Sequence, residues 1–341
     1  MTPPLRVAVV GYGLAGRVFH APLVAAQPDM EVAAVVTGDP DRAAAAAADH
    51  PGVRVLPSAD ALWDDPGAVD LVVVAAANRA HVPLARAAIA AGLPVVVDKP
   101  LAPDAARARA LADEAEAAGV MLTVFQNRRW DADLLTARRL LEEGAVGAPV
   151  RFVSRFDRWR PAVNRDAWRE RPDAEDAGGL LMDLGSHLID QAILLFGPPV
   201  EVHGEVGRRR AGAQVDDDVE VSLLHEGGVR SHLGATMLAA LPGPRMRLTG
   251  LAGEWEVHGL DPQEGALRAG ARPGDPGFGE VPEAAWGVIS DGAAPRPVPS
   301  ARGDWPAFYA GVALALRDGG PPPVDPRDAV QVLEIIDAAR A

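Results

Sequence analysis

Residues Leu5 to His20 read LRVAVVGYGLAGRVFH, an apolar run followed by three closely spaced glycines and a helical pattern. The glycines Gly11, Gly13 and Gly16 have the spacing G-x-G-x-x-G, which is informative when it joins a strand to a helix, as it does here. The first glycine permits a tight turn, the second admits a pyrophosphate to backbone N–H groups, and the third allows close helix–strand packing. The stretch therefore predicts a dinucleotide-binding turn. We expect cofactor contacts from all of its residues, Gly11, Tyr12, Gly13, Leu14, Ala15 and Gly16.

The residue that reads the cofactor ribose is expected at the end of the second strand, roughly 20 residues after the glycines. The strand here ends in Thr37, and Gly38 follows it in place of an acidic residue. Without an acid at the strand tip, repulsion of a 2′-phosphate is weakened, and Thr37 with Arg42 nearby can hold one, although Asp39 and Asp41 reduce the margin. Thr37, Gly38 and Arg42 therefore favour NADP. The alternative is NAD, with Asp39 reaching back to the ribose.

The composition is that of a globular protein with enough residues for two domains, because the chain has 341 residues and 48% of them are hydrophobic. The net charge of −14 argues against a nucleic-acid partner, which needs a basic surface. The sequence contains no cysteine, which excludes disulfides, thiolate catalysis and cysteine-based zinc sites. We find no signal segment and no uninterrupted apolar run of membrane-spanning length, so we expect a cytoplasmic protein with no membrane partner.

The order of strand and helix patterns predicts an α/β fold with two domains. In the first part, apolar strands alternate with helices, which is typical of a parallel, doubly wound sheet. The second part reads as strands joined by tight turns, and we expect an antiparallel meander there, with loop over residues 261–302. The predicted boundaries are 1–125 for a Rossmann domain, 126–303 for an α+β domain with an open, mainly antiparallel sheet, and 304–341 for helices that pack back on the first domain.

Polar residues follow the carboxyl ends of the predicted parallel strands, where ligands bind in such sheets. Lys99 is placed between an apolar strand and Pro100, an unusual position for a solvated lysine. A peptide bond before proline can be cis and can aim this side chain inward. The alternative is an ordinary surface lysine at a strand end. We favour a role at the site.

One apolar helix, predicted over residues 180–196, carries Asp183 and His187 four residues apart. This spacing places a carboxylate and an imidazole on the same helix face, where both can contact one ligand. The alternative is a surface Asp–His pair without a ligand.

The chain resembles the glucose-fructose oxidoreductase and inositol dehydrogenase family (Gfo/Idh/MocA) over essentially its whole length. The family usually has EKP where this sequence has Asp98-Lys99-Pro100. Segments GYGLAGRVFHAPL, NRRWD, DLGSHLIDQ and ALRAG are most similar to the NADP-dependent scyllo-inositol dehydrogenase branch. The matching features, in order, are the glycine turn, Asn78 with His81, VDKPL around Lys99, Trp168-Arg169, and Gly178-Gly179 followed by Asp183 and His187.

The resemblance implies hydride transfer between a secondary alcohol of a cyclic polyol or sugar and a nicotinamide ring. It makes His187 the acid/base that takes the hydroxyl proton, since imidazole titrates near neutral pH. Lys99 hydrogen-bonds the same oxygen and the cofactor, and Asp183 orients the substrate. Further cofactor contacts are implied for Asn78, His81, Trp168 and Arg169, and substrate contacts for Gln126, Arg129, Trp130 and Arg160. For Arg129 and Arg160 the alternative is solvent-exposed charge.

Two other functions fit the sequence less well. A cofactor-binding redox or metabolite sensor has no need of Lys99, Asp183 and His187 together. A metal enzyme is disfavoured because the histidines have no ligand spacing such as H-E-x-x-H. Because long apolar strands in an open sheet leave a face to cover, we also expect a homodimer or homotetramer.

Overall fold

The computed structural model describes residues 3–165 and 167–341, and the chain forms two compact units. The first unit comprises Met1–Asn127, Gln263–Phe278 and Trp305–Val330. The second comprises Arg128–Pro262, Gly279–Asp304 and Gln331–Ala341.

The first unit is a Rossmann domain with a parallel sheet, as predicted. The strand order is β3-β2-β1-β4-β5-β6, and the apolar strands β4 and β5 are buried on both faces. Such burial is expected when helices cover both sides of a parallel sheet. The strands are β1 (Leu5–Val10), β2 (Met30–Val36), β3 (Arg54–Leu56), β4 (Leu71–Val74), β5 (Val95–Asp98) and β6 (Leu122–Phe125).

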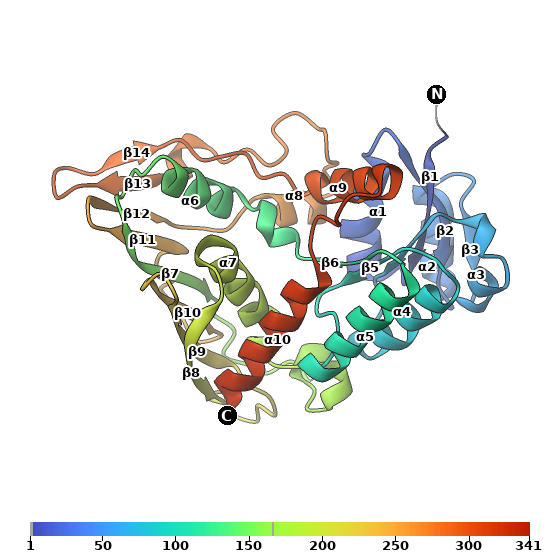
Figure 1. The fold of residues 1–341 in the computed structure, drawn as a ribbon, viewed down its shortest axis with the longest axis horizontal. Coiled ribbons are helices and arrows are strands. Elements are labelled where there is room, and N and C mark those ends of the chain that lie inside the picture. Colours follow the sequence, from blue (N-terminus) through green and yellow to red (C-terminus); the bar gives the residue numbers. More distant parts are fainter. Residues whose placement is uncertain (1–2, 166) are drawn as a thin grey trace. The chain divides into compact units, whose positions relative to one another are not determined.

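Helices cover the two faces of this sheet, with α4 and α5 on one side and α1 and α9 on the other (Figure 1). Local sequence sets their ends: Asp104 caps α5 by accepting the N–H of Arg107 at 2.8 Å, and Gly119 ends it with φ +64°. The helices of this unit are α1 (Ala21–Ala25), α2 (Pro40–Asp49), α3 (Asp60–Asp64), α4 (His81–Ala90), α5 (Ala105–Ala118), α8 (Gln263–Arg268) and α9 (Pro306–Asp318), and α10 (Pro326–Arg340) begins in it.

The helix after the glycine turn differs from the regular helix that we expected. It starts as a π-helical segment, Ala15–His20, and becomes α-helical only in α1. The N–H of Ala21 donates to the carbonyl of Gly16, five residues back, where an α-helix uses the carbonyl four residues back. Apolar periodicity predicts a helix here but does not distinguish these two hydrogen-bond patterns.

The second unit contains one open sheet with strand order β14-β13-β12-β11-β7-β10-β9-β8. Most neighbours are antiparallel, as predicted, but β10 and β7 are parallel, so the expected simple meander was wrong. The strands are β7 (Pro149–Asp157), β8 (Pro199–Gly207), β9 (Asp218–His225), β10 (Arg230–Thr236), β11 (Met246–Gly250), β12 (Gly253–Val257), β13 (Gly287–Ser290) and β14 (Arg296–Val298).

Residues 261–302 are not the loop that we expected. They contain α8 and the short strands β13 and β14, and β13 extends the sheet by pairing Ile289 with Trp255 of β12. The many glycines and prolines of this region hide the signal of such short strands, because pairing with an existing sheet edge, and not local propensity, stabilises them.

The last helix also differs from the expected division, since its C-terminal part, Gln331–Ala341, belongs to the second unit. The reason is close packing on β8, where a Cβ atom placed on Gly204 would lie 2.1 Å from the carbonyl oxygen of Ala339. Conversely, α8 returns to the first unit, where the Arg268 guanidinium lies 5.5 Å from the ring centroid of Phe19.

Helices α6 (Ala132–Glu142) and α7 (Ser186–Phe196) lie against the same side of the second sheet (Figure 1). The stretch 174–196 is long and apolar enough to span a membrane, but 78% of its apolar window is buried in the protein. Arg245 ties this core together, donating to Ser154 Oγ at 2.5 Å and to Gln191 Oε1 at 3.0 Å, with Asp133 at 3.1 Å. A buried guanidinium needs such partners to offset its desolvation.

We expected an oligomer because we assumed that the open face of this sheet is apolar. This face also carries charged side chains. Ion pairs cross its strands, with Arg247 Nη2 2.5 Å from Glu256 and Arg155 Nη1 2.7 Å from Glu220. The strands alternate, so most of their apolar residues face the helices and most of their polar residues face outward. The sheet therefore exposes ion pairs as well as the apolar side chains of Val150, Val200 and Val206, and the expected oligomer stays a prediction.

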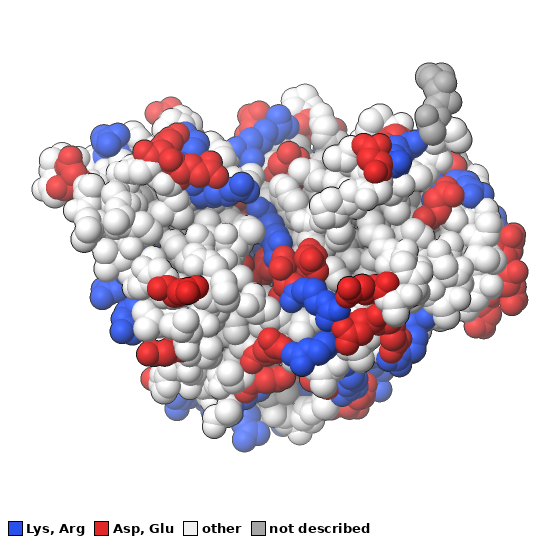
Figure 2. Space-filling view, viewed as in Figure 1, with Lys and Arg blue, Asp and Glu red and all other residues white. Residues whose placement is uncertain are grey.

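Charges of both signs also mix over the described residues of the face drawn in Figure 2, where no continuous basic surface is visible. Within the first unit, Arg86 Nε lies 2.6 Å from Glu114 and Arg327 Nη2 lies 2.6 Å from Asp113. Exposed pairs of this kind contribute little stability, on the order of 0.5 kcal/mol each.

The second unit should lose stability as the pH falls below about 6.5, because of His225. Burial lowers the pKa of His225, against the opposing effect of its bond to the Gly197 carbonyl. The unfolded chain therefore binds more protons than the folded one below the ordinary histidine pKa, so stability is complete above it and declines on acidification. We expect a lower free energy of unfolding at pH 5 than at pH 7, with this residue contributing to the difference. Urea unfolding at both pH values checks it: His225→Gln should reduce the difference, and the exposed control His203→Gln should not.

Candidate active site

The glycine turn has the geometry that a dinucleotide needs. Gly11 has φ +97°, and a Cβ atom there would lie 2.6 Å from the Ala75 carbonyl oxygen. A Cβ atom on Gly16 would lie 2.0 Å from the Gly11 carbonyl oxygen, so only glycine permits this approach of helix and strand. A Cβ atom placed on Gly13 would meet no atom closer than 3.7 Å, so the backbone of Gly13 is accessible. The turn therefore fits a bound pyrophosphate.

The other residues of the turn differ in their surroundings. Leu14 is 48% exposed, whereas the Tyr12 ring is buried and its hydroxyl donates to Asp49 Oδ2 at 3.1 Å. Burial and the neighbouring Asp49 carboxylate both raise the pKa of Tyr12, which keeps the phenol protonated. Tyr12 thus helps to hold the turn, and only its backbone is suited to a phosphate.

At the tip of β2, the acidic residue near the ribose-reading position is already engaged. Asp39 caps α2, accepting the N–H groups of Asp41 and Arg42 at 2.9 and 3.1 Å. Its other oxygen lies 3.5 Å from Arg42 Nε. Thr37 Oγ1 accepts the Asp39 N–H at 3.3 Å, and the Arg42 guanidinium is the group nearest to Gly13. A Cβ atom placed on Gly38 would meet no atom closer than the Pro57 carbonyl oxygen at 3.6 Å, so there is room at this position.

Lys99 follows β5 directly, and its peptide bond to Pro100 is cis. It is the only lysine among the 33 lysine and arginine residues of the sequence. Arginine therefore fills every other lysine-or-arginine position of the sequence. This distinction of Lys99 was present in the sequence, and our reading of the motifs missed it.

Asp98, the residue before Lys99, is part of a polar cluster. Two other members of this cluster, His20 and Tyr309, were not predicted from the sequence. The Asp98 carboxylate accepts the Lys99 N–H at 2.9 Å and lies 3.8 Å from His20 Nε2. The other ring nitrogen of His20 lies 2.7 Å from the Tyr309 hydroxyl. Burial tends to raise the pKa of Asp98, but His20, His81 and Lys99 outweigh it and lower the pKa. Asp98 is therefore an anion at neutral pH.

His81 begins α4 and is fixed between two backbone carbonyls of the same unit. Nδ1 lies 2.8 Å from Pro100 O, and Nε2 lies 3.2 Å from Ala76 O. Burial lowers the pKa of His81, so the ring is neutral and donates its single N–H to one of them. His81 thereby links the strand end at Ala76 to the proline after Lys99. Asn78 lies in the 3₁₀ turn Asn78–Ala80 just before it.

In the second unit, Asp183 and His187 lie in one continuous helical stretch, and both are buried. The π-helical segment Leu181–Gly185 contains Asp183, and His187 is in the first turn of α7. The four-residue spacing thus spans a change from π to α geometry, a feature frequent at functional sites. Arg169 Nε lies 3.3 Å from Asp183 Oδ2, and its guanidinium lies 5.3 Å from the Trp168 ring centroid. The structure therefore brings Trp168, Arg169 and Asp183 together.

The predicted substrate residues near the unit boundary have mixed environments. Arg129 forms a two-point ion pair with Asp190 of α7, at 2.9 and 2.6 Å, so simple solvent exposure is excluded for it. Gln126 is buried. The backbone carbonyl oxygen of Trp130 accepts the N–H of Asp304 at 2.9 Å. Arg160 is exposed, which agrees with the alternative that it is a solvent-exposed charge.

Across residues 3–165 and 167–341, no group of three or more histidine, aspartate or glutamate side chains could hold a metal ion. The polar groups that the structure does assemble are pairs and networks suited to hydrogen bonding and proton transfer.

Residues 5–126 match the family model described as "Oxidoreductase family, NAD-binding Rossmann fold", and residues 134–256 match "GFO/IDH/MocA C-terminal domain". The chain is 40% identical to the uncharacterized oxidoreductase YdgJ of Escherichia coli, with 99% of this chain and 96% of YdgJ covered. It is 33% identical to the Bacillus subtilis scyllo-inositol 2-dehydrogenase (NADP+) IolW, with 98% and 92% covered. A solved structure of the Bacillus subtilis oxidoreductase YvaA is similar at TM-score 0.94 and 32% identity, covering 100% and 96%.

Proposed function

Because the chain belongs to the GFO/IDH/MocA family of oxidoreductases, we propose that it transfers hydride between a secondary alcohol of a cyclic polyol or sugar and NADP. The observation that carries the proposal is a glycine turn that fits a pyrophosphate, together with Lys99 directly after β5 and the buried Asp183 and His187 in one helical stretch. Similarity to a scyllo-inositol 2-dehydrogenase supports an inositol-like substrate.

In this proposal each residue has one task. When the dinucleotide is bound, its nicotinamide ring would supply the hydride acceptor. The turn with Gly11, Gly13 and Gly16 would hold its pyrophosphate. His187 takes the proton of the substrate hydroxyl as the carbonyl forms. Lys99 donates a hydrogen bond to the same oxygen and stabilises the negative charge that develops there.

Orientation of the substrate is assigned to Asp183, whose carboxylate accepts a hydrogen bond from a neighbouring hydroxyl. Arg169 offsets the cost of burying this carboxylate, since its Nε lies 3.3 Å away. A polyol presents several hydroxyls, so a fixed acceptor beside the acid/base selects the carbon that is oxidised.

The proposed activity is tested by incubating the protein with a panel of inositols and aldoses and each nicotinamide cofactor, following absorbance at 340 nm, the standard wavelength for the reduced ring. Turnover of a cyclic polyol or sugar supports the proposal. If no member of the panel is oxidised or formed although the cofactor binds, the protein is a sensor of the kind considered above and the proposal is wrong.

We expect NADP to be preferred over NAD by roughly ten- to a hundredfold in kcat/KM, equivalent to about 1.4–3 kcal/mol. Asp39 is engaged in capping α2 and in pairing with Arg42, which supports Thr37, Gly38 and Arg42 as the ribose-side contacts. Thr37→Asp should reverse the preference, because the new carboxylate repels a 2′-phosphate and bonds both ribose hydroxyls. Measuring kcat/KM with both cofactors decides it: an unchanged ratio in the variant would mean that Thr37 does not read the ribose.

We further propose a cytoplasmic homodimer or homotetramer that pairs through the open sheet of the second unit. The cross-strand pairs Arg247–Glu256 and Arg155–Glu220 give this face charges of both signs, which suits a self-complementary, two-fold contact. Light scattering at micromolar concentration should give a multiple of the 35.6 kDa chain mass, and a monomeric mass would contradict the proposal.

A further inference from the structure

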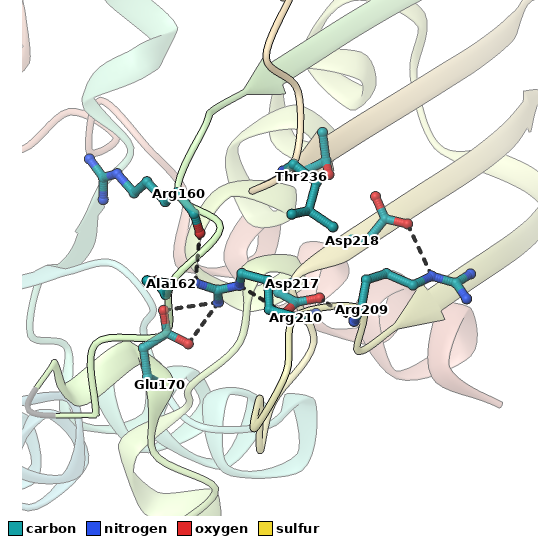
Figure 3. Close-up of polar contacts among 9 residues, drawn as sticks. Arg160, Ala162, Glu170, Arg209, Arg210, Asp217, Asp218 and Thr236 are labelled. Atoms are coloured by element: carbon teal, nitrogen blue, oxygen red, sulfur yellow. Dashed lines mark hydrogen bonds and ion pairs between the residues drawn. The ribbon is translucent and has the colours of Figure 1, made fainter.

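A buried arginine of the second unit joins two segments that carry predicted site residues. Arg210 lies in the loop between β8 and β9, and 2% of its side chain is exposed. Its Nη2 donates to both carboxylate oxygens of Glu170 at 2.9 and 2.8 Å, and its Nε donates to Asp217 Oδ2 at 2.9 Å (Figure 3). Its Nη1 donates to the carbonyls of Arg160 and Ala162 at 3.3 and 3.4 Å. We call Arg210, Glu170 and Asp217 the arginine cluster.

The arginine cluster is buried on all sides, which makes its geometry hard to change. The side chains of Glu170 and Asp217 are 8% and 0% exposed. The Asp217 carboxylate also accepts the backbone N–H groups of Arg209 and Arg210 at 2.7 and 3.1 Å. Burial alone lowers the pKa of Arg210, but the two carboxylates outweigh it and raise the pKa. Loss of one partner would leave a buried charge uncompensated.

On one side, the arginine cluster holds Arg169, the residue before Glu170. The carbonyl of Arg169 accepts the Gly179 N–H at 2.9 Å, and its guanidinium pairs with Asp183. A Cβ atom on Gly178 would lie 2.4 Å from the Arg171 carbonyl oxygen, so the chain around Arg169 packs closely against the start of the site helix.

On the other side, the residue before Asp217 holds the beginning of the helix that carries Asp183. The carbonyl of Asp216 accepts the Leu180 N–H at 2.9 Å, and its Oδ2 accepts the Leu181 N–H at 2.6 Å. A pocket is lined by residues of both segments and of the loop, namely Arg169, Glu170, Gly179, Leu180, Asp183, Arg210, Asp216 and Met237. Both members of the Arg169–Asp183 pair are therefore attached to one loop.

We propose that Arg210 is a positioning residue, which sets the geometry of the Arg169–Asp183 pair by holding Arg169 through Glu170 and the Asp183 helix through Asp216–Asp217. This inference rests on the proposed function, in which Asp183 orients the substrate. Arg210 does not itself contact the reacting atoms. Its loss should weaken substrate orientation and, through the predicted cofactor contact Arg169, cofactor binding to a smaller extent.

The test uses the full-length protein with Arg210→Lys and Glu170→Gln, which preserve most of the buried volume, and with Arg209→Ala as the matched control. Arg209 is in the same loop, but its side chain is 63% exposed and lies 3.4 Å from Asp218 (Figure 3). We expect both cluster variants to raise KM for the polyol substrate about tenfold or more, and to weaken NADPH binding less than this because only Arg169 and Trp168 of the predicted cofactor contacts lie in this segment. Trypsin should also cleave faster after Arg169 in Arg210→Lys, and Arg209→Ala should match the parent in every measurement.

Each outcome decides the proposal. Folded cluster variants with parental kcat and KM, together with a parental cleavage rate in Arg210→Lys, would show that Arg210 only stabilises the unit, and would overturn it. A fall in kcat with unchanged KM would support it, because a misoriented substrate still binds but reaches the transition state less often. If the parent turns over no member of the panel, the proposed function is wrong, and the positioning role is judged by cleavage alone: an unchanged rate in Arg210→Lys rejects it.

Discussion

Replacing Lys99 or His187 by alanine should lower kcat by on the order of a hundredfold or more while the cofactor still binds. Both residues are assigned to the reacting oxygen, and neither is assigned to the phosphates of the dinucleotide. Lys99→Arg should fail as well, because arginine stays protonated and presents a wider, planar group than an ammonium. The occurrence of arginine at every other lysine-or-arginine position of the sequence makes this substitution the most informative one at Lys99.

Steady-state kinetics on the best substrate, together with fluorescence titration of NADPH, measures the two effects separately. His203→Ala is a suitable control, since His203 is an exposed histidine of β8 with no assigned role. Near-parental turnover in Lys99→Ala and His187→Ala would show that the catalytic residues lie elsewhere. Loss of NADPH binding in His187→Ala would instead place this histidine in the cofactor site.

The two glycines Gly13 and Gly16 should respond differently to alanine. Gly16→Ala places a Cβ atom 2.0 Å from the Gly11 carbonyl oxygen, so strand and helix must separate, at a cost of about 3 kcal/mol in the free energy of unfolding. Cofactor binding should be lost with it, because the displaced Gly11 backbone forms the phosphate turn. Gly13→Ala meets no atom closer than 3.7 Å, so we expect near-parental stability and weaker cofactor binding, since the methyl group occupies the approach of the pyrophosphate.

Urea unfolding and NADPH titration of both variants check this prediction. Equal loss of stability in the two variants would mean that the free protein already packs tightly around Gly13. Unchanged NADPH affinity in Gly13→Ala would show that the pyrophosphate does not approach at this glycine.

Much of the site could be predicted from sequence because its residues are tied to local signals. The glycine turn, the lysine before a proline and the Asp183–His187 spacing each lie within a few residues of the element that positions them. His20, Tyr309 and Arg210 could not be predicted in this way. His20 meets Tyr309 from 289 positions away, and Arg210 meets Glu170 from 40 positions away, so no local pattern links the partners.

The sequence by itself determined the Rossmann domain and the mainly antiparallel sheet of the second unit. It did so because buried parallel strands and alternating strands leave short-range hydrophobic periods. The tertiary structure alone decided the parallel pairing of β7 with β10, the strands β13 and β14 at the sheet edge, and the ion pairs on the open face. Register and pairing depend on contacts between distant strands, and burial of Arg210 or Asp98 is tolerated only when several segments supply partners at once. Those contacts have no period along the chain, so only the folded molecule contains them.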